Sequence, residues 1–155
     1  METTNIKGNK GLANVILKLI EKNYFVFLPF ADTTCVDLIV TNSKMEVKRI
    51  QIKYRSISKT GTLDIPTQTV VNGKKIEVDL NKTDIWIVYC PDNNMIYYIP
   101  ISELKGKKQL SLRVEMPKQK QMSMHFAKDY ESLENAWNKN GSVPNAGKGA
   151  NLLNS

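Results

Sequence analysis

Three side chains that suit phosphodiester hydrolysis lie close together in the first part of the chain: Asp37, Gln51 and Lys53. Asp37 stands near the start of a predicted strand from Val36 to Thr41. Gln51 and Lys53 are two residues apart on the next predicted strand, from Met45 to Arg55, and they share a face because side chains alternate along a strand. A hairpin between the two strands can bring Asp37 beside this pair. The sequence therefore predicts a carboxylate, an amide oxygen and an ammonium around one point.

This trio fits metal-assisted hydrolysis of a phosphate ester. Mg²⁺ prefers hard oxygen ligands and keeps several waters. The predicted ligands are the Asp37 carboxylate, the Gln51 amide oxygen and the backbone carbonyl of Ile52, with Mn²⁺ as an alternative ion. A bound metal lowers the pKa of its water, and Lys53 is predicted to stabilise the negative charge that develops on the phosphate. Because Gln51 is neutral, we expect weak metal binding until the DNA phosphate adds its charge.

The segments around these residues resemble a known superfamily. Val36-Asp37 followed by Gln51-Ile52-Lys53 resembles the motif of the PD-(D/E)XK nucleases, in its Q-x-K variant. The flanking segments are similar to group I intron-encoded homing endonucleases of that superfamily, whose cousins are the archaeal Holliday-junction resolvases: Leu28 to Asp32, Val36 to Val40 and Arg49 to Arg55. The resemblance spans about Lys7 to Pro100. It implies an α/β (α+β) fold with a restriction-endonuclease-like core, a mixed β-sheet flanked by helices.

The resemblance also implies an activity and partners. It implies a site-specific DNA endonuclease, a homing enzyme, that acts with Mg²⁺ on double-stranded DNA as a homo-oligomer, a dimer or a tetramer. One residue departs from the pattern, because such nucleases often carry a Glu on the first helix that helps to hold the metal, and Leu12 stands at that position. Two alternatives therefore stay open: a catalytically inactive DNA-binding module of the same fold, and a Holliday-junction resolvase with the same site.

The charge of the chain favours a polyanionic partner. Its 155 residues include 22 Lys and Arg but 15 Asp and Glu, a formal net charge of +7, and each phosphate contact releases counterions. The residues predicted to contact DNA surround the site or lie on a hairpin that turns at Asn72-Gly73 and has the shape of a groove-reading ribbon. They are Lys48, Arg49, Arg55, Lys59, Gln68, Lys74 and Lys75. An alternative of equal weight is that this is an ordinary exposed hairpin that does not contact DNA.

The elements that position these residues follow from apolar periodicity. A helix is predicted from Lys10 to Lys22, with Asn23 as its stop, and short helices at Ile101 to Leu104, capped by Ser102, and at Tyr130 to Trp137. Beyond the two strands of the site, strands are predicted at Tyr24 to Leu28, Thr67 to Val71, Lys74 to Val78, Asp84 to Cys90 (central, because it is the most apolar), Met95 to Ile99 and Gln109 to Met116 (an edge strand). The order predicts a helix, a sheet meander and a second helical piece.

Domain organisation and location follow from composition. Residues 1–138 are predicted to form one domain, and residues 139–155, rich in Asn, Gly, Ser and Lys, a disordered tail. No stretch approaches the ~18 apolar residues of a membrane span, and an intracellular location is expected, cytoplasmic with an organellar one left open. Cys35 and Cys90 are isolated, which argues against a zinc site or a disulfide framework. His125, the only histidine, is predicted to be a surface or satisfied residue instead of a catalytic base.

Overall fold

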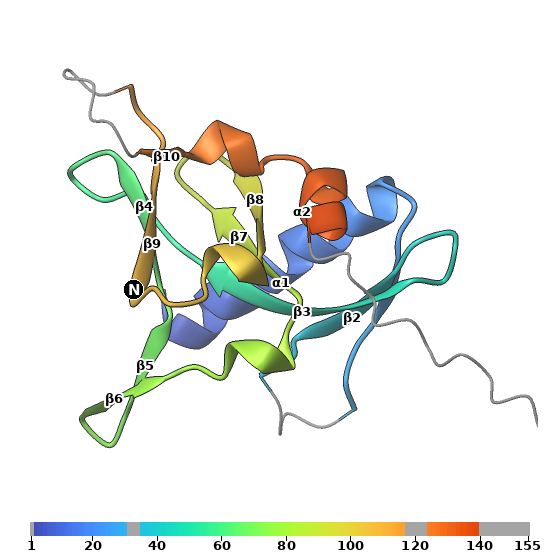
Figure 1. Ribbon diagram of the computed structural model, residues 1–155, viewed down its shortest axis with the longest axis horizontal. Helices are drawn as coiled ribbons and strands as arrows, with labels where there is room; N and C mark the ends of the chain where they lie inside the picture. Colours follow the sequence, from blue (N-terminus) through green and yellow to red (C-terminus); the bar gives the residue numbers. More distant parts are fainter. Residues whose placement is uncertain (1, 31–34, 117–123, 140–155) are drawn as a thin grey trace, which may run out of the picture.

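Two β-sheets packed face to face form the centre of the computed structural model, which describes residues 2–30, 35–116 and 124–139 (Figure 1). The large sheet has the strand order β1-β2-β3-β7-β8, and the smaller one the order β10-β9-β4. The large sheet consists of β1 (Phe25–Phe27), β2 (Leu38–Thr41), β3 (Val47–Tyr54), β7 (Ile85–Cys90) and β8 (Met95–Pro100). Within the large sheet, strands β3 and β7 are parallel and the other three pairs are antiparallel. The predicted mixed α+β class is confirmed.

The first helix, α1 (Thr4–Glu21), begins earlier than its apolar stripe. Thr3 caps it, because the Thr3 hydroxyl accepts a hydrogen bond of 3.4 Å from the Ile6 N–H. The predicted start at Lys10 was wrong, since the first two turns are polar and lack an apolar period. The predicted stop is confirmed: Asn23 has φ +62°, and its N–H donates to the Ile20 carbonyl at 2.9 Å.

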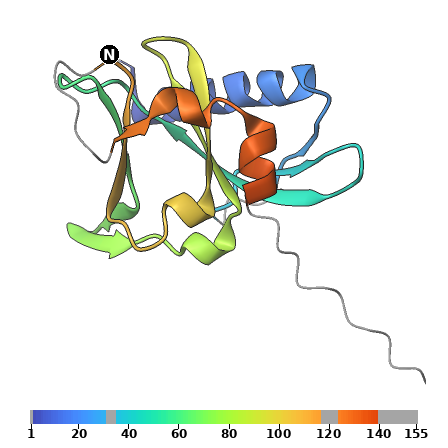
Figure 2. The same cartoon turned by 45° about the horizontal axis from the view of Figure 1, so that its top comes forward.

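The two faces of the large sheet bury different partners. Helix α1 and the short α2 (Leu133–Lys139) cover one face, and α2 lies by the C-terminal end of α1 (Figure 2). The other face packs on the smaller sheet of β4 (Thr62–Pro66), β9 (Gln109–Arg113) and β10 (His125–Phe126). Every residue of β7 is buried, because β7 has hydrogen-bonded strands on both sides and a covered surface on both faces. This agrees with its prediction as the central apolar strand.

Several expectations about the chain path were wrong. The sheet is not a meander, because the chain leaves β3, builds β4 and a hairpin, and returns as the parallel strand β7. Strand β9 was predicted at an edge but lies between β10 and β4. Ser102 does not cap the turn η2 (Ile101–Glu103), whose first flanking residue is Pro100. The turns η1 (Leu80–Lys82) and η3 (Ala127–Tyr130) precede β7 and α2. These features depend on pairings between distant segments, which local patterns do not encode.

The predicted hairpin is confirmed as β5 (Gln68–Val71) and β6 (Lys74–Glu77). Asn72 and Gly73 have φ values of +50° and +75°, as an Asn-Gly type I′ turn requires. Apart from the half-buried Gln68, the hairpin is exposed, and it projects from the body of the molecule in Figure 1.

Of the predicted tail, Lys139 belongs to α2 and residues 140–155 lie outside the described residues. Among the helices that the structure describes, none is long and apolar enough to cross a membrane. His125 is exposed and its Nδ1 lies 3.0 Å from the Tyr130 hydroxyl, so the prediction of a satisfied surface histidine is confirmed. Cys35 and Cys90 are free thiols.

Candidate active site

Asp37 is tied to β3 by both its main chain and its side chain. It immediately precedes β2, whose first residue, Leu38, pairs with Ile50. The Asp37 N–H donates to the Ile50 carbonyl at 2.8 Å, and the Asp37 carboxylate accepts a hydrogen bond of 2.6 Å from the Ile52 N–H. The carboxylate therefore lies against the one residue that separates Gln51 from Lys53.

Gln51 carries an oxygen suited to a cation. Its Oε1 is buried and has no hydrogen-bond partner among the described residues. Buried polar atoms are nearly always hydrogen-bonded, so such an oxygen calls for an explanation, and a bound cation would provide one. Among the described residues no group of three or more His, Cys, Asp and Glu could hold a metal. A hard cation here would depend on one carboxylate and neutral oxygens, and the residues present fit that requirement.

Lys53 shares the strand face of Gln51 and interacts with Asp37. Burial lowers the pKa of the Lys53 ammonium and the Arg55 guanidinium lowers it further, whereas Asp37 and Cys35 act in the opposite direction. Asp37 therefore acts on the Lys53 ammonium as an opposite charge that favours its protonated form. The structure thus joins the Asp37 carboxylate to Ile52 and places Gln51 and Lys53, the two sequence neighbours of Ile52, on one face of β3.

Two cavities give access to this point. A cavity of about 750 Å³ lies between the N-terminal half of α1, the segment after β1 and the end of β3, and Asp37 and Ile52 line it. A second cavity of about 410 Å³ is lined by Ile52, Lys53 and Arg55. Because Ile52 lines both, the acid and the ammonium open onto neighbouring spaces that a phosphate could enter.

The helix contributes no carboxylate to the larger cavity. Leu12, the residue at the position of the expected Glu, lines that cavity. Asn9 and Asn5 line it too, about one and two turns nearer the start of α1 than Leu12. Sequence reasoning missed these two amides because it began the helix at Lys10. The capping hydroxyl of Thr3 was the signal that could have revealed them.

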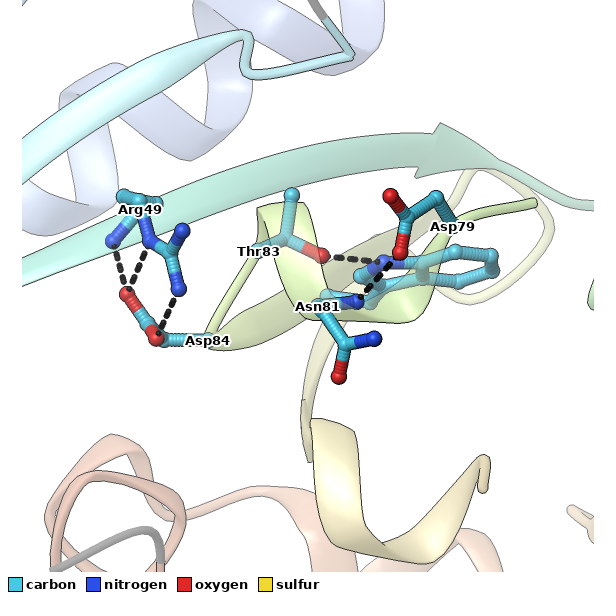
Figure 3. A network of polar contacts seen from close by, with 6 residues as sticks. Arg49, Asp79, Asn81, Thr83 and Asp84 are labelled. Atoms are coloured by element: carbon cyan, nitrogen blue, oxygen red, sulfur yellow. Dashed lines mark hydrogen bonds and ion pairs between the residues drawn. The ribbon is translucent and has the colours of Figure 1, made fainter. Parts of the chain in front are cut away.

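The predicted DNA-binding residues divide by position. Arg49 does not reach the cavities, because its guanidinium binds the Asp84 carboxylate through two hydrogen bonds of 3.0 and 2.9 Å (Figure 3). The Lys48 ammonium lies over the Trp137 ring, 5.6 Å from its centroid, on the helix-covered side of the sheet. Both residues are four or five positions from Lys53, about 13 to 17 Å along the strand. Lys48 and Arg49 therefore line neither cavity, and their contact with DNA stays a prediction.

The other predicted contacts are better placed. Arg55 lines the smaller cavity, and its Nη1 donates to the Tyr54 carbonyl at 3.1 Å. Lys59 is exposed on the loop after β3. On the hairpin, Lys74 and Lys75 are exposed and pair with Val71 and Val70 across the turn. Because neighbouring side chains of a strand point to opposite faces, the two lysines present charge on both faces of the ribbon.

Comparisons with known proteins agree with this architecture. The model of a family described as PD-(D/E)XK endonuclease matches residues 2–133. Among solved structures, the bacterial homing endonuclease I-Ssp6803I has a TM-score of 0.71 and 19% identity, covering 88% of this chain and 92% of that one. Hjc, a Holliday junction resolvase from Archaeoglobus fulgidus, has a TM-score of 0.46 and 12% identity, covering 69% and 84%. A search of curated proteins found no significant match.

The family match includes all three residues of the candidate site. It extends from the start of α1 to the first residue of α2, and it agrees with the likeness in fold to the homing endonuclease. The resemblance seen in the sequence is thereby confirmed, and the chain belongs to the PD-(D/E)XK endonuclease family.

Proposed function

We propose that the chain is a site-specific endonuclease of the homing type, which hydrolyses phosphodiester bonds of double-stranded DNA with Mg²⁺. The observation that carries the proposal is the 2.6 Å hydrogen bond from the Ile52 N–H to the Asp37 carboxylate, which holds the acid against the strand that carries Gln51 and Lys53. Asp37 and Lys53 each line a cavity that Ile52 also lines, which supports access to a phosphate. Family membership and the net charge of +7 support a nuclease that acts on DNA. Similarity in fold to a homing endonuclease supports the choice of homing activity.

The residues have distinct proposed roles. The Asp37 carboxylate, the Gln51 Oε1 and the Ile52 carbonyl would hold Mg²⁺. When bound, the ion lowers the pKa of a water ligand and neutralises charge on the scissile phosphate. The Ile52 N–H fixes one oxygen of Asp37 at 2.6 Å, so this ligand is oriented before the ion arrives. Lys53 donates to a phosphate oxygen whose negative charge increases as the water oxygen bonds to phosphorus and the bond to the leaving sugar oxygen breaks.

The test is a cleavage assay on a supercoiled plasmid library, followed by sequencing of the ends. The wild-type chain should cut at a defined sequence with Mg²⁺ and not with a chelator. Asp37→Asn and Lys53→Ala should each lose at least about 100-fold in rate, the magnitude of losing one group that stabilises the transition state. Asp64→Asn is the matched control, because Asp64 lies in β4 and accepts from the Ser111 hydroxyl at 2.7 Å. Equal cleavage by wild type and both site variants would remove the assignment.

A second candidate function is DNA binding without cleavage. It is favoured by Leu12, an apolar residue in the cavity wall where a helix carboxylate is expected. In that case the chain retains DNA in a gel-shift assay but leaves it intact with both Mg²⁺ and Mn²⁺. Cleavage with either ion decides against it.

We further propose that the enzyme works as a homo-oligomer, a dimer or a tetramer. A domain of this size covers few base pairs, and cutting both strands of a site requires two active centres. Large apolar side chains on the edge strand β1 and just after it support this proposal, since Phe25, Phe27 and Leu28 are more than half exposed. Sedimentation velocity should show a multimer that Phe27→Ser weakens and Ile76→Ser, on the hairpin, does not. A monomer at micromolar concentration would contradict the proposal.

A further inference from the structure

The buried Trp86 lies beneath the ammonium of Lys53. Lys53 Nζ is 4.8 Å from the centroid of the indole ring, within the distance at which a cation is attracted to an aromatic face. Trp86 belongs to β7, pairs with Gln51 across the parallel ladder, and so points to the same side of the sheet as Gln51 and Lys53. One indole ring therefore adjoins two of the three proposed catalytic side chains.

The ring is itself held in place. Trp86 is fully buried in the core between the two sheets, and its indole N–H donates to the Thr83 hydroxyl at 3.0 Å. Thr83 is also buried and stands just before β7 (Figure 3). Packing fixes the position of the ring, and the hydrogen bond fixes its rotation about the side-chain axis. A ring that cannot move provides a fixed surface for a flexible partner.

The Lys53 side chain is flexible, so a fixed surface is required to hold its ammonium at one position. A lysine side chain has four rotatable carbon–carbon bonds, and its ammonium is a point charge with no preferred direction. Holding the ammonium at one place costs rotamer entropy. Charges nearby favour different directions, since Asp37 attracts the ammonium and Arg55 repels it. The indole face adds an attraction that keeps the ammonium on the sheet, beside the Asp37 carboxylate.

We propose that Trp86 is a positioning residue of the nuclease site, which uses its indole face to hold the Lys53 ammonium where it meets the scissile phosphate. This inference rests on the proposed function, because it assigns Lys53 to the phosphate. Thr83 contributes through the ring that it orients. DNA affinity depends on many phosphate contacts, so loss of this positioning should slow cleavage far more than it weakens binding.

Fluorinated tryptophan tests the proposal with almost no change of shape. Fluorine withdraws electron density from the ring face and so weakens its attraction for a cation. The chain has two tryptophans, so a Trp137→Phe background leaves Trp86 as the only fluorinated residue. With saturating DNA and Mg²⁺, the single-turnover rate constant should fall stepwise through the mono-, di- and trifluoro proteins. An attraction of about 0.5 to 1 kcal/mol corresponds to a total loss of about two- to fivefold. The dissociation constant for DNA should stay the same.

The matched control uses the other tryptophan, which also has a lysine over its ring, because Lys48 Nζ lies 5.6 Å from the Trp137 centroid. In a Trp86→Phe background only Trp137 is fluorinated, and the rate constant should not depend on fluorine content. Flat rates in the Trp137→Phe background, or an equal fall in both backgrounds, would overturn the proposal.

A readout without cleavage separates this inference from the proposed function. In the metal-free protein, the indole ring current should move the Lys53 side-chain protons upfield in the NMR spectrum, and Trp86→Leu should remove that shift. If wild type shows the shift but cuts no DNA, the proposed function fails and the Lys53–Trp86 contact stands. If the shift is missing in a protein that cuts DNA, the contact is wrong and the positioning role fails with it.

Discussion

The carboxylate of Asp37 accepts a hydrogen bond of 2.6 Å from the backbone N–H of Ile52, the residue between Gln51 and Lys53. One side chain thus serves the fold and the proposed chemistry together. It satisfies an amide at the end of the β2–β3 ladder and holds a carboxylate beside the strand that carries the other two proposed groups.

This double role predicts different effects for two substitutions of the same residue. Asp37→Ala leaves the Ile52 N–H without its acceptor, which should lower the free energy of unfolding by about 1 to 2 kcal/mol. Asp37→Asn keeps an oxygen acceptor and should stay within about 0.5 kcal/mol of wild type in the same measure. Both should lose cleavage. Urea unfolding followed by circular dichroism gives the two stabilities, and equal losses in the two variants would contradict the structural role of the carboxylate.

The sequence was sufficient for this hairpin because its determinants are local. Alternation along β3 places Gln51 and Lys53 on one face, and the short connection from β2 brings Asp37 to them. The Asn72-Gly73 turn was predictable for the same reason, since an Asn-Gly pair supplies two positive φ values.

Features that depend on distant segments were not predictable. The position of Trp86 under Lys53 requires the parallel pairing of β3 with β7, and the interior position of β9 requires its pairing with β4. The sequence between the paired strands contains no pattern that predicts either pairing. The interaction of Arg49 with Asp84 could not be predicted for the same reason, because it joins residues 35 positions apart.

The neutral side chain of Gln51 predicts how metal binding depends on DNA. Gln51→Glu adds a negative charge at a buried oxygen that has no partner in the described part of the chain, so it should raise the affinity for Mg²⁺ in the absence of DNA. The gain on adding DNA should then be smaller than in wild type. Calorimetric titrations in a Lys53→Ala background, which should leave the DNA intact, measure both affinities. Gln68→Glu on the hairpin is the control, and equal metal affinity for wild type with and without DNA would refute the idea.

The positive charge of Arg55 should depress the basicity of Lys53. Burial is the largest cause of the lowered pKa of Lys53, and Arg55 is the next. Arg55→Gln removes that repulsion and should raise the pKa of the Lys53 ammonium, which titration of its ¹³Cε resonance in metal-free protein would detect. Lys59→Gln, on the exposed loop after β3, should leave the resonance titrating as in wild type. An unchanged or lower pKa in Arg55→Gln would show that the guanidinium does not act on this site.

The hairpin lysines should reveal whether the β5–β6 ribbon contacts phosphate. Lys74→Ala and Lys75→Ala should each reduce the slope of log K against log salt concentration by about 1, because each contact releases about one counterion. Lys18→Ala is the control, since Lys18 lies at the opposite end of α1 from the cavity and pairs with Glu21 at 3.1 Å. Fluorescence anisotropy over a series of salt concentrations gives the slopes. Slopes equal to wild type in both hairpin variants would leave this ribbon without a role in binding.

The pairing of Arg49 with Asp84 should make stability depend on pH at its acidic end. Burial raises the pKa of Asp84, but hydrogen bonds from the Arg49 guanidinium and N–H outweigh burial, and the pKa lies below its ordinary value. A carboxylate with a lowered pKa stabilises the fold above its unfolded pKa, near 4, and this contribution disappears as pH falls through the folded pKa. Asp84→Asn should therefore lower the free energy of unfolding by about 1 kcal/mol near neutral pH, a small value because the pair is partly exposed. The difference in stability between the variant and wild type should shrink as the pH falls below about 4. Arg49→Gln removes the guanidinium that pairs with Asp84, and it should likewise make the free energy of unfolding fall less steeply at acid pH. Unfolding curves from pH 7 to 2 give the free energy of unfolding at each pH. If wild type and both variants lose stability in parallel as the pH falls, the charges of the pair do not contribute to stability.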